Sequence, residues 1–268
     1  MNVVRKSYVL AMPNERLALQ EDALVSKLLV NDKLSKFLKV IDTGIDSGNV
    51  REKMFFKEFN KSHPDKIIQG RQIEHWAVWW DSPNAKYKYC DPNYVAQDSL
   101  GIGRGGKPSS LKEYWGFRGD ISNHFVDERI LIRQTADSIF GAYHNLKEDG
   151  QYFTDNTLFT VLLKDQGGSL KYFLGILNSK LLNYIYKYLS MEEGKVLAQV
   201  KTALVDELPI VHDKKKEKEV VALVDALITK KRANHGCDVK ELEYKLDVLI
   251  CEIYGLNEHE RNLVLNLN

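Results

Sequence analysis

A glycine-rich segment at residues 101–110, with the sequence Gly-Ile-Gly-Arg-Gly-Gly-Lys-Pro-Ser-Ser, has the composition of a loop that cradles phosphate groups. A nucleotide-binding loop of that kind needs a preceding strand and a following helix whose N-terminus faces the phosphate. The residues that follow contain Pro108 and no clear helix. We therefore interpret the segment as a basic surface loop, in which Arg104 and Lys107 are candidates for contacts with a DNA backbone.

Two further segments contain parts of catalytic motifs but lack the rest. Cys90-Asp-Pro-Asn-Tyr94 is loosely similar to the Asn/Asp-Pro-Pro-Tyr motif of amino-methyltransferases, but the second proline is missing and no Gly-rich cofactor motif precedes it. We interpret it as a turn with an aromatic packing residue. Pro64-Asp65-Lys66 resembles the start of a nuclease signature, yet no Asp-x-Lys or Glu-x-Lys follows before Cys90 to bind Mg²⁺ and water. We expect a loop there.

The histidines and cysteines give no metal site. His63 and His75 have no cysteine or carboxylate partner at zinc spacing. Cys90, Cys237 and Cys251 are odd in number and widely spaced, which is typical of reduced thiols in the cytoplasm. The sequence therefore predicts no catalytic residue, no metal and no cofactor in this chain.

All four tryptophans lie between Trp76 and Trp115, among tyrosines and basic residues. The tyrosines are Tyr87, Tyr89, Tyr94 and Tyr114, and the basic residues include Lys86, Lys88, Arg104, Lys107 and Lys112. Rings in such a run usually form a core with solvated lysines around it, and we expect this of most of them. The alternative is a DNA-facing surface with basic side chains on phosphates.

The composition is that of an ordinary soluble protein, with 44% apolar and 28% charged residues and a net charge of +1. Residues 190–268 hold 12 basic against 15 acidic residues, whereas residues 1–189 hold 26 against 22. Because phosphate contacts dominate DNA affinity, so weakly charged a module needs a partner to bind DNA tightly. The longest apolar run, Leu170 to Leu189, is interrupted by polar residues, so no membrane span is expected.

Apolar periodicity predicts helices in the C-terminal third. We expect one helix from a Ser169 cap to Leu189, a second from Glu217 to Arg232, and a third that opens with an Asp238/Glu241 capping box and ends at Gly255. Asn257 with Glu260 opens a final short helix, and the second and third should form an antiparallel hairpin.

Residues 37–165 have short apolar segments separated by Gly, Pro, Asn and Asp, which indicates an irregular β-rich domain. The expected segments are Phe37–Ile41, Ala77–Trp80, Ile130–Arg133 and Leu158–Leu163, and a helical stretch at Glu21–Phe37 precedes them. We divide the chain into a lead-in at 1–36, a recognition domain at 37–205 and a helical hairpin at 206–268.

Six segments, in order, resemble one known family. They are Thr43-Gly-Ile-Asp-Ser-Gly-Asn49, Ile67-Ile-Gln-Gly-Arg-Gln-Ile73, Glu128-Arg-Ile-Leu-Ile-Arg-Gln-Thr135, Thr154-Asp-Asn-Thr-Leu-Phe159, Leu174-Gly-Ile-Leu-Asn-Ser-Lys180, and the helix from Leu242 to Leu256. The set resembles the TaqI-like C-terminal specificity domain of adenine-specific DNA methyltransferases and fused type IIG restriction enzymes. Each element alone is weak, but the ordered set is specific. The resemblance runs from about residue 37 to the end of the sequence.

The resemblance implies an α+β fold, with an irregular, β-helix-like recognition body and a C-terminal antiparallel α-hairpin. It also implies recognition of double-stranded DNA, while a separate methyltransferase domain or subunit, in some systems with a nuclease, flips and methylates an adenine. Within the motifs, Gly44, Gly48 and Gly70 are expected to serve turns that need positive φ. Thr154 to Asn156 should hold a turn, and Asn178 and Lys180 the polar side of a helix.

Arginine and glutamine suit base recognition, since arginine can donate twice to guanine and glutamine can pair both ways with adenine. The resemblance supports Arg71, Gln72, Arg133 and Gln134, and Gln72 stands where the family usually has an acid. Arg118 is a loop candidate, with Arg104. Because Arg133 and Gln134 are successive residues of an expected strand, they point to opposite faces, and one of them should be structural.

Three functions remain open. The first is a DNA-recognition module of a restriction-modification or phage-defence methyltransferase, encoded separately or as part of a longer enzyme. The second is a complete enzyme with a degenerate methyltransferase or nuclease site, against which the missing motifs count. The third is a protein-interaction module whose acidic C-terminal half docks a methyltransferase subunit.

Overall fold

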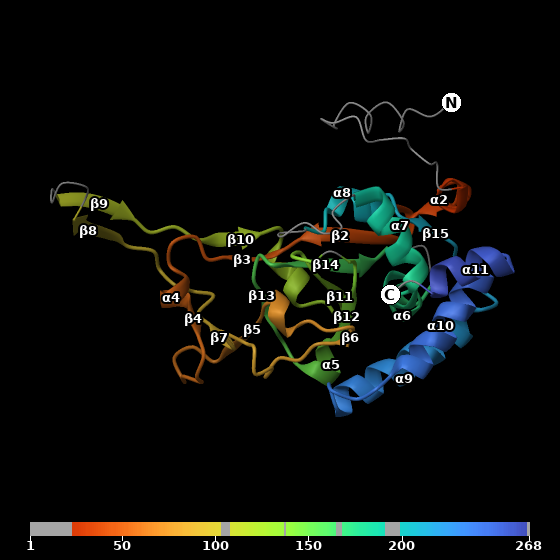
Figure 1. The fold of residues 1–268 in the computed structure, drawn as a ribbon. Helices are drawn as coiled ribbons and strands as arrows, with labels where there is room; N and C mark the ends of the chain where they lie inside the picture. Colours follow the sequence, from red (N-terminus) through yellow and green to blue (C-terminus); the bar gives the residue numbers. More distant parts are fainter. Residues whose placement is uncertain (1–22, 103–107, 137, 165–167, 191–198, 267–268) are drawn as a thin grey trace, which may run out of the picture.

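The computed structural model describes residues 23–102, 108–136, 138–164, 168–190 and 199–266 (Figure 1). Within them the chain has the predicted α+β architecture, with ten α-helices and five separate sheets. The β-helix-like body is not confirmed, because none of these sheets closes into a barrel and their strands are joined by irregular loops rather than repeating coils.

The largest sheet contains five strands, and β-branched and aromatic residues make up much of it. Their order is β2 (Leu38–Asp42), β14 (Leu158–Leu163), β11 (Glu128–Arg133), β12 (Gly141–Asn145) and β6 (Trp76–Ala77), and only the β12–β6 pair is parallel. Alternation sends Ile130 and Ile132 into the main core under the helices, and Leu131 into a smaller cluster on the opposite face. The segments predicted at 130–133 and 158–163 are confirmed. The strand segments predicted at Phe37–Ile41 and Ala77–Trp80 are confirmed only in part. Phe37 is the last residue of a helix, and Ala77 is the only residue of the second segment that lies in a named strand.

A second sheet lies beside the first and carries the small core around Ile45, Phe55 and Ile67. Its order is β13 (Phe153–Thr154), β5 (Asp65–Ile68), β7 (Tyr89–Cys90) and β4 (Phe55–Phe56), which follows α4 (Arg51–Met54). Asp65 and Lys66 open β5, so the loop predicted at Pro64-Asp65-Lys66 is wrong. The segment pairs with β7 and β13 because its apolar half, Ile67 and Ile68, is buried.

Two further antiparallel pairs extend this side of the molecule. β3 (Gly44–Asp46) pairs with β10 (Gly116–Arg118), which precedes the 3₁₀ turn η2 (Ile121–His124). β8 (Asp98–Ile102) pairs with β9 (Pro108–Lys112) in a hairpin that extends away from the rest of the molecule (Figure 1). The glycine-rich segment therefore leads into a strand, whereas a phosphate-binding loop leads into the N-terminus of a helix. Arg104 and Lys107 lie outside the described residues.

The C-terminal helices lie at the other end of the molecule from the β8–β9 hairpin (Figure 1). They are α9 (Glu217–Ala233), α10 (Lys240–Ile253) and α11 (Glu258–Leu265), and the predicted hairpin is confirmed. The Asn257/Glu260 capping box and the Gly255 cap, with φ of +65°, are also as predicted. No described helix is both long and apolar enough to cross a bilayer.

The capping box predicted from Asp238 and Glu241 is wrong. Helix α10 has Val239 as its N-cap, and the Asp238 carboxylate accepts only from the Lys240 amide, at 2.9 Å. Glu241 instead pairs with Lys245, one turn further along the helix, at 2.6 Å. The Glu241 carboxylate therefore bonds a cation four residues along the helix, and it makes no hydrogen bond to the N-cap.

The single helix predicted from Leu170 to Leu189 is divided into α6 (Leu170–Leu177) and α7 (Lys180–Ser190). Ser169 caps α6 as expected. Asn178 breaks the helix because its buried amide bonds both backbone groups of Gly141, at 2.7 and 2.9 Å. Asn178 is therefore a structural clamp on β12, and the surface role predicted for it is wrong.

The helix predicted at Glu21–Phe37 is also interrupted, and its first two residues lie outside the described residues. The chain forms α2 (Ala23–Leu28), β1 (Asp32–Lys33) and α3 (Leu34–Phe37). β1 pairs with β15 (Pro209–Ile210), which follows α8 (Thr202–Asp206). The main core draws on all three predicted domains, with members such as Leu24, Val161, Leu174, Val224 and Leu246. The division at residues 36 and 205 stays a prediction.

Candidate nucleic-acid interface

Most of the polar candidates meet where three strands of the large sheet end. We call this region the sheet end. It comprises Asp42, Arg133, Gln134, Thr157 and Leu158, which lie in the strands or directly next to them, and it includes the bordering residues Arg71 and Arg118. Arg133 pairs with Leu158, whose neighbour Phe159 pairs with Asp42. One step beyond, the Gln134 amide donates to the Thr157 carbonyl at 2.9 Å. Residues more than 100 positions apart in sequence are thereby fixed side by side.

The 3₁₀ turn η1 (Gly70–Gln72) lies against β11 at this end. The Gly70 amide donates to Thr157 Oγ1 at 2.8 Å, and a Cβ on Gly70 would lie only 3.2 Å from Arg133 Cγ. Glycine is therefore needed for close approach, and the positive φ predicted for Gly70 is wrong. The positive φ predicted for Gly44 and Gly48 is confirmed, at +122° and +47°.

A buried carboxylate holds η1 to the start of β14. Asp155 accepts from Gln69 Nε2 at 2.8 Å, from the Thr157 amide at 3.0 Å, and from the Thr157 hydroxyl. Burial raises the pKa of Asp155, and these hydrogen bonds counteract part of that shift. The turn predicted at Thr154 to Asn156 is thus stabilised by side-chain hydrogen bonds, and it fixes the backbone from which Arg71 projects.

Arg71 and Arg133 are the two cations that this arrangement leaves uncompensated. Arg71 is exposed on η1, and Arg133 is half-buried at the end of β11. Within the described part of the chain neither guanidinium has a carboxylate or hydrogen-bond partner. Two arginines with free donors beside one another form a surface suited to phosphate or to base edges.

Arg118 and Gln134 lie on the same surface but are engaged. Arg118 contacts Asp46 through Nε and Nη2 at 3.2 and 3.1 Å, and Asp42 through Nη1 at 3.3 Å. The two carboxylates raise the pKa of the Arg118 guanidinium, chiefly through the Asp46 hydrogen bond. Gln134 Nε2 donates to the other oxygen of Asp42 at 3.3 Å. Arg133 and Gln134 were predicted to be successive residues of one strand, with one of them buried, but β11 ends at Arg133 and neither side chain is buried.

Gln72 has no surface to offer a base in this structure. It is fully buried, and its amide oxygen accepts from the Gln69 amide at 2.9 Å while its nitrogen donates to the Trp80 carbonyl at 2.5 Å. These bonds use the polar groups that would have to face adenine. Of the pair at 71 and 72, Arg71 alone is accessible, and Gln72 holds the turn.

The aromatic run is largely structural, as expected. Trp76 and Tyr87 are buried, and Trp80 donates through its indole nitrogen to the Lys88 carbonyl at 3.0 Å. Lys66 Nζ lies 4.4 Å from the centre of the Trp80 ring. This cation–π contact orients the Lys66 ammonium toward the Trp80 ring, so that charge is less available to a ligand.

Two residues that sequence reasoning missed secure the base of the β8–β9 hairpin. Asn49 donates to the Lys112 carbonyl at 3.1 Å and accepts from the Tyr114 amide at 3.0 Å. Glu113 accepts from Tyr94 Oη, the Gln97 amide and Lys53 Nζ. These bonds, led by Lys53, lower the pKa of Glu113 to about 2. Asn49 is the last residue of the first segment that resembles the family, and this position was the sequence signal that could have identified it.

The segment with partial similarity to a methyltransferase motif forms a turn. The Cys90–Tyr94 segment is a turn in which Asp91 accepts from the Asn93 amide at 3.0 Å, and Tyr94 packs against the small core, as predicted. Burial raises the pKa of the Cys90 thiol above its usual range. Among the described residues, no three histidine, cysteine or acidic side chains are grouped as metal ligands would be.

The family model for the TaqI-like C-terminal specificity domain matches residues 65–210, more than half of the chain. The chain belongs to this family. The match includes four of the six resembling elements and the sheet-end residues Arg71, Arg118, Arg133 and Gln134, while Asp42 lies before it. Helices α9 to α11 of this specificity-domain protein lie after it. Among curated proteins, none matches the chain.

Proposed function

We propose that this specificity-domain protein recognises a particular duplex DNA sequence for a restriction-modification enzyme, through the surface at the sheet end. The observation that supports the proposal is the pair Arg71 and Arg133, two guanidinium groups on the matched domain that have no partner among the described residues. Arg118 and Gln134 lie beside them with exposed polar atoms. Catalysis then belongs to a methyltransferase domain or subunit, and to a nuclease where one is present.

The physical basis is the division between phosphate and base contacts. A guanidinium on phosphate strengthens binding to every sequence, whereas a guanidinium on guanine discriminates by about 1–3 kcal/mol. Thr157 Oγ1 accepts from the Gly70 amide and Asp155 accepts from Gln69 Nε2, so the backbone next to Arg71 is held in a fixed position. A rigid backbone favours base recognition, because less conformational entropy is lost on binding.

The test is a selection of bound duplexes from a randomised pool by the full chain, repeated for Arg71→Ala and Arg133→Ala. We expect at least one variant to lose discrimination at a single position of the selected sequence. Arg261→Ala is the matched control, since Arg261 lies on α11 at the far end of the molecule. The proposed function is wrong if wild-type protein selects no sequence, or if both Arg71→Ala and Arg133→Ala select the same sequence as wild type.

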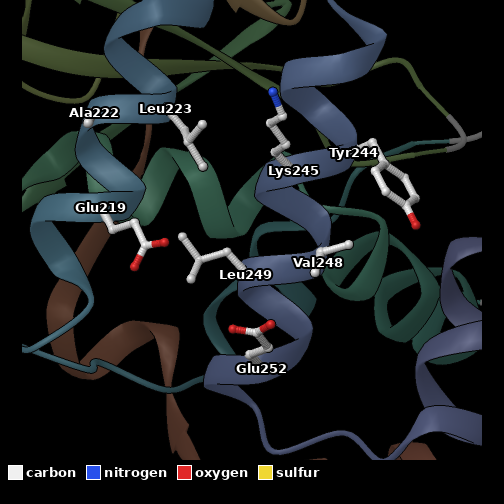
Figure 2. Close-up of a pocket in the computed structure, with 8 residues that line it drawn as sticks. All are labelled: Glu219, Ala222, Leu223, Tyr244, Lys245, Val248, Leu249 and Glu252. Carbon is white, nitrogen blue, oxygen red and sulfur yellow. The ribbon is translucent and has the colours of Figure 1, made fainter.

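A second candidate function is docking of the methyltransferase part on the C-terminal hairpin, and a groove between α9 and α10 favours it. Figure 2 shows Leu223 of α9 and Leu249 of α10 pointing into the space between the helices, with the carboxylates of Glu219 and Glu252 toward one end and Lys245 toward the other. The lining comprises Glu219, Ala222, Leu223, Tyr244, Lys245, Val248, Leu249 and Glu252. Tyr244 is 59% exposed, an unusual position for a large ring.

The two functions are compatible and separable. Tyr244→Ser should leave DNA selection by this chain unchanged and weaken its association with a methyltransferase part, because only the groove loses apolar surface. Unchanged association would remove the docking role without affecting DNA recognition.

We also propose that this chain alone binds no S-adenosylmethionine, because it lacks a Gly-rich cofactor loop and the catalytic tetrapeptide. Calorimetry of the full chain with S-adenosylmethionine is the test. A micromolar dissociation constant would contradict this assignment and favour the degenerate-methyltransferase alternative.

A further inference from the structure

Two carboxylates, Asp42 and Asp46, lie within the surface proposed to face DNA. Their side chains are 47% and 41% exposed. A carboxylate close to phosphate is repelled, so acids are unfavourable wherever a surface meets the DNA backbone. Base edges are different, since a carboxylate accepts from the exocyclic amino group of cytosine in the major groove. Acids at this position therefore indicate which part of the duplex this surface meets.

The donors of Arg118 are only partly used. A guanidinium has five N–H groups, and three bonds to Asp46 and Asp42 engage Nε, Nη2 and Nη1 once each. One hydrogen remains on each terminal nitrogen. Two parallel donors on the terminal nitrogens are what a guanine needs at O6 and N7. If Asp42 accepts the outer hydrogen of Nη1, the two remaining hydrogens are parallel, and Arg118 can bind guanine while both ion pairs remain in place.

Asp42 has matching acceptor capacity. Its Oδ1 accepts one hydrogen from Gln134 Nε2 and its Oδ2 one from Arg118 Nη1, both at 3.3 Å. An ionised carboxylate has about four lone-pair positions, so about two are left for a base. An acceptor next to a free donor pair matches the major-groove edge of a cytosine–guanine pair, which offers one amino group beside two acceptors.

The backbone under this network is ordered by strand pairing. In the β10–β3 pair, Arg118 lies opposite Gly44, two residues from Asp46, and Asp42 ends β2 in the large sheet. Gly119, with φ of +67°, turns the chain so closely that a Cβ there would lie 3.1 Å from the Asp42 carbonyl oxygen. The donors and acceptors are thus arranged before DNA binds, which reduces the entropic cost of recognition.

We propose that Arg118 and Asp42 together read one cytosine–guanine base pair in the major groove, with Arg118 on the guanine and Asp42 on the cytosine amino group. Asp46 and Gln134 hold the pair in place. The inference rests on the proposed function and adds to it two acidic residues and the identity of one base pair in the target.

The test uses the full chain and the duplex that wild-type protein selects. Single base-pair changes are measured in competition with wild type, Arg118→Lys and Asp42→Asn. Lysine keeps the charge but has no two-donor fork, and asparagine keeps the shape but replaces one acceptor by a donor. We expect both variants to lose roughly 10- to 100-fold of discrimination at the same cytosine–guanine position, and little elsewhere. Replacing that guanine by 7-deazaguanine should weaken wild type more than Arg118→Lys, because lysine lacks the rigid two-donor fork.

The control is Asp127→Asn, which removes an exposed acid at the opposite end of β11 whose side chain has no partner among the described residues. The inference is overturned if the two variants affect different positions or none, or if Asp42→Asn binds every sequence more tightly, as a carboxylate near phosphate would. Wild-type protein that selects no sequence would instead overturn the proposed function, and this inference with it.

Discussion

The sheet end and the C-terminal hairpin differ in how their charges are used. On the hairpin, Lys216 pairs with Glu219 and Lys245 with Glu241, while Arg232 pairs with Asp149 of the β-rich part. At the sheet end, Arg71 and Arg133 have no partner within the described residues. Among the described residues, the cations without a carboxylate partner on the hairpin are lysines such as Lys218, Lys230 and Lys240. At the sheet end they are arginines, whose planar fork can donate twice to one base.

The joint between the two regions is the first place to test this difference. Trp76 in β6 is buried against the helices and donates to Glu243 of α10 at 2.8 Å. Its φ of +79° is a conformation that few aromatic residues adopt. Its neighbour Trp79 stacks on His235 with ring centres 4.6 Å apart. These contacts, with Arg232 on Asp149, hold the hairpin against the β-rich part of the molecule.

We expect the largest effect from Trp76→Ala, which should cost about 3–5 kcal/mol of unfolding free energy. The substitution removes a large buried ring and leaves Glu243 without its donor. Urea denaturation at pH 7 measures the loss, and Trp79→Ala, at a half-buried ring, should cost clearly less. Equal losses for the two variants would show that Trp76 is not the principal contact of the joint.

Next in size is a pH-dependent effect at Asp247 on α10, where burial raises the pKa to about 6. Because the folded-state pKa exceeds the unfolded value of about 3.9, the protonated carboxyl stabilises the fold below about pH 4, and this contribution is lost as pH rises through 6. Asp247→Asn stays neutral, so it should be more stable than wild type at pH 8, by on the order of 2 kcal/mol. The advantage should shrink toward pH 4.

Denaturation at a series of pH values checks this, with the exposed Glu252→Gln on the same helix as control. A difference between Asp247→Asn and wild type that is constant from pH 4 to 8 would contradict a raised pKa.

The smallest effect is expected from neutralising Lys214, Lys215 and Lys216 together to glutamine. These lysines precede α9, whose surroundings are acidic, and Lys216 already pairs with Glu219 at 3.0 Å. DNA affinity should change by less than about 0.5 kcal/mol, and its salt dependence should stay the same. Titrations at two or more salt concentrations are the measurement. A large loss with a shallower salt slope would place DNA on the hairpin.

The same comparison explains what sequence could predict. Helices α9, α10 and α11 follow from local periodicity and caps, and their bounds differ from prediction by a residue or two. Periodicity failed at Asn178 because the hydrogen bonds that break the helix go to Gly141, a partner 37 residues away. Strands at 130–133 and 158–163 were found from apolar residues, but their pairing order was not.

The candidate site shows a similar limit. Composition and resemblance identified Arg71, Arg118, Arg133 and Gln134, and the fold brings them to one region. The exposure of each side chain could not be predicted, because nothing in the sequence distinguishes exposed Arg71 from its buried neighbour Gln72. Asp42 was missed because acids are not expected in a DNA-binding surface, and its role depends on Arg118, 76 positions away.

The most direct test of the account is hydrogen exchange of the full chain with and without the duplex that it selects. The account predicts slower exchange in peptides that contain residues 69–72, 117–119 and 133–135 when DNA is bound, and no change in α9 and α10. Protection of α9 and α10 without protection at the sheet end would contradict it.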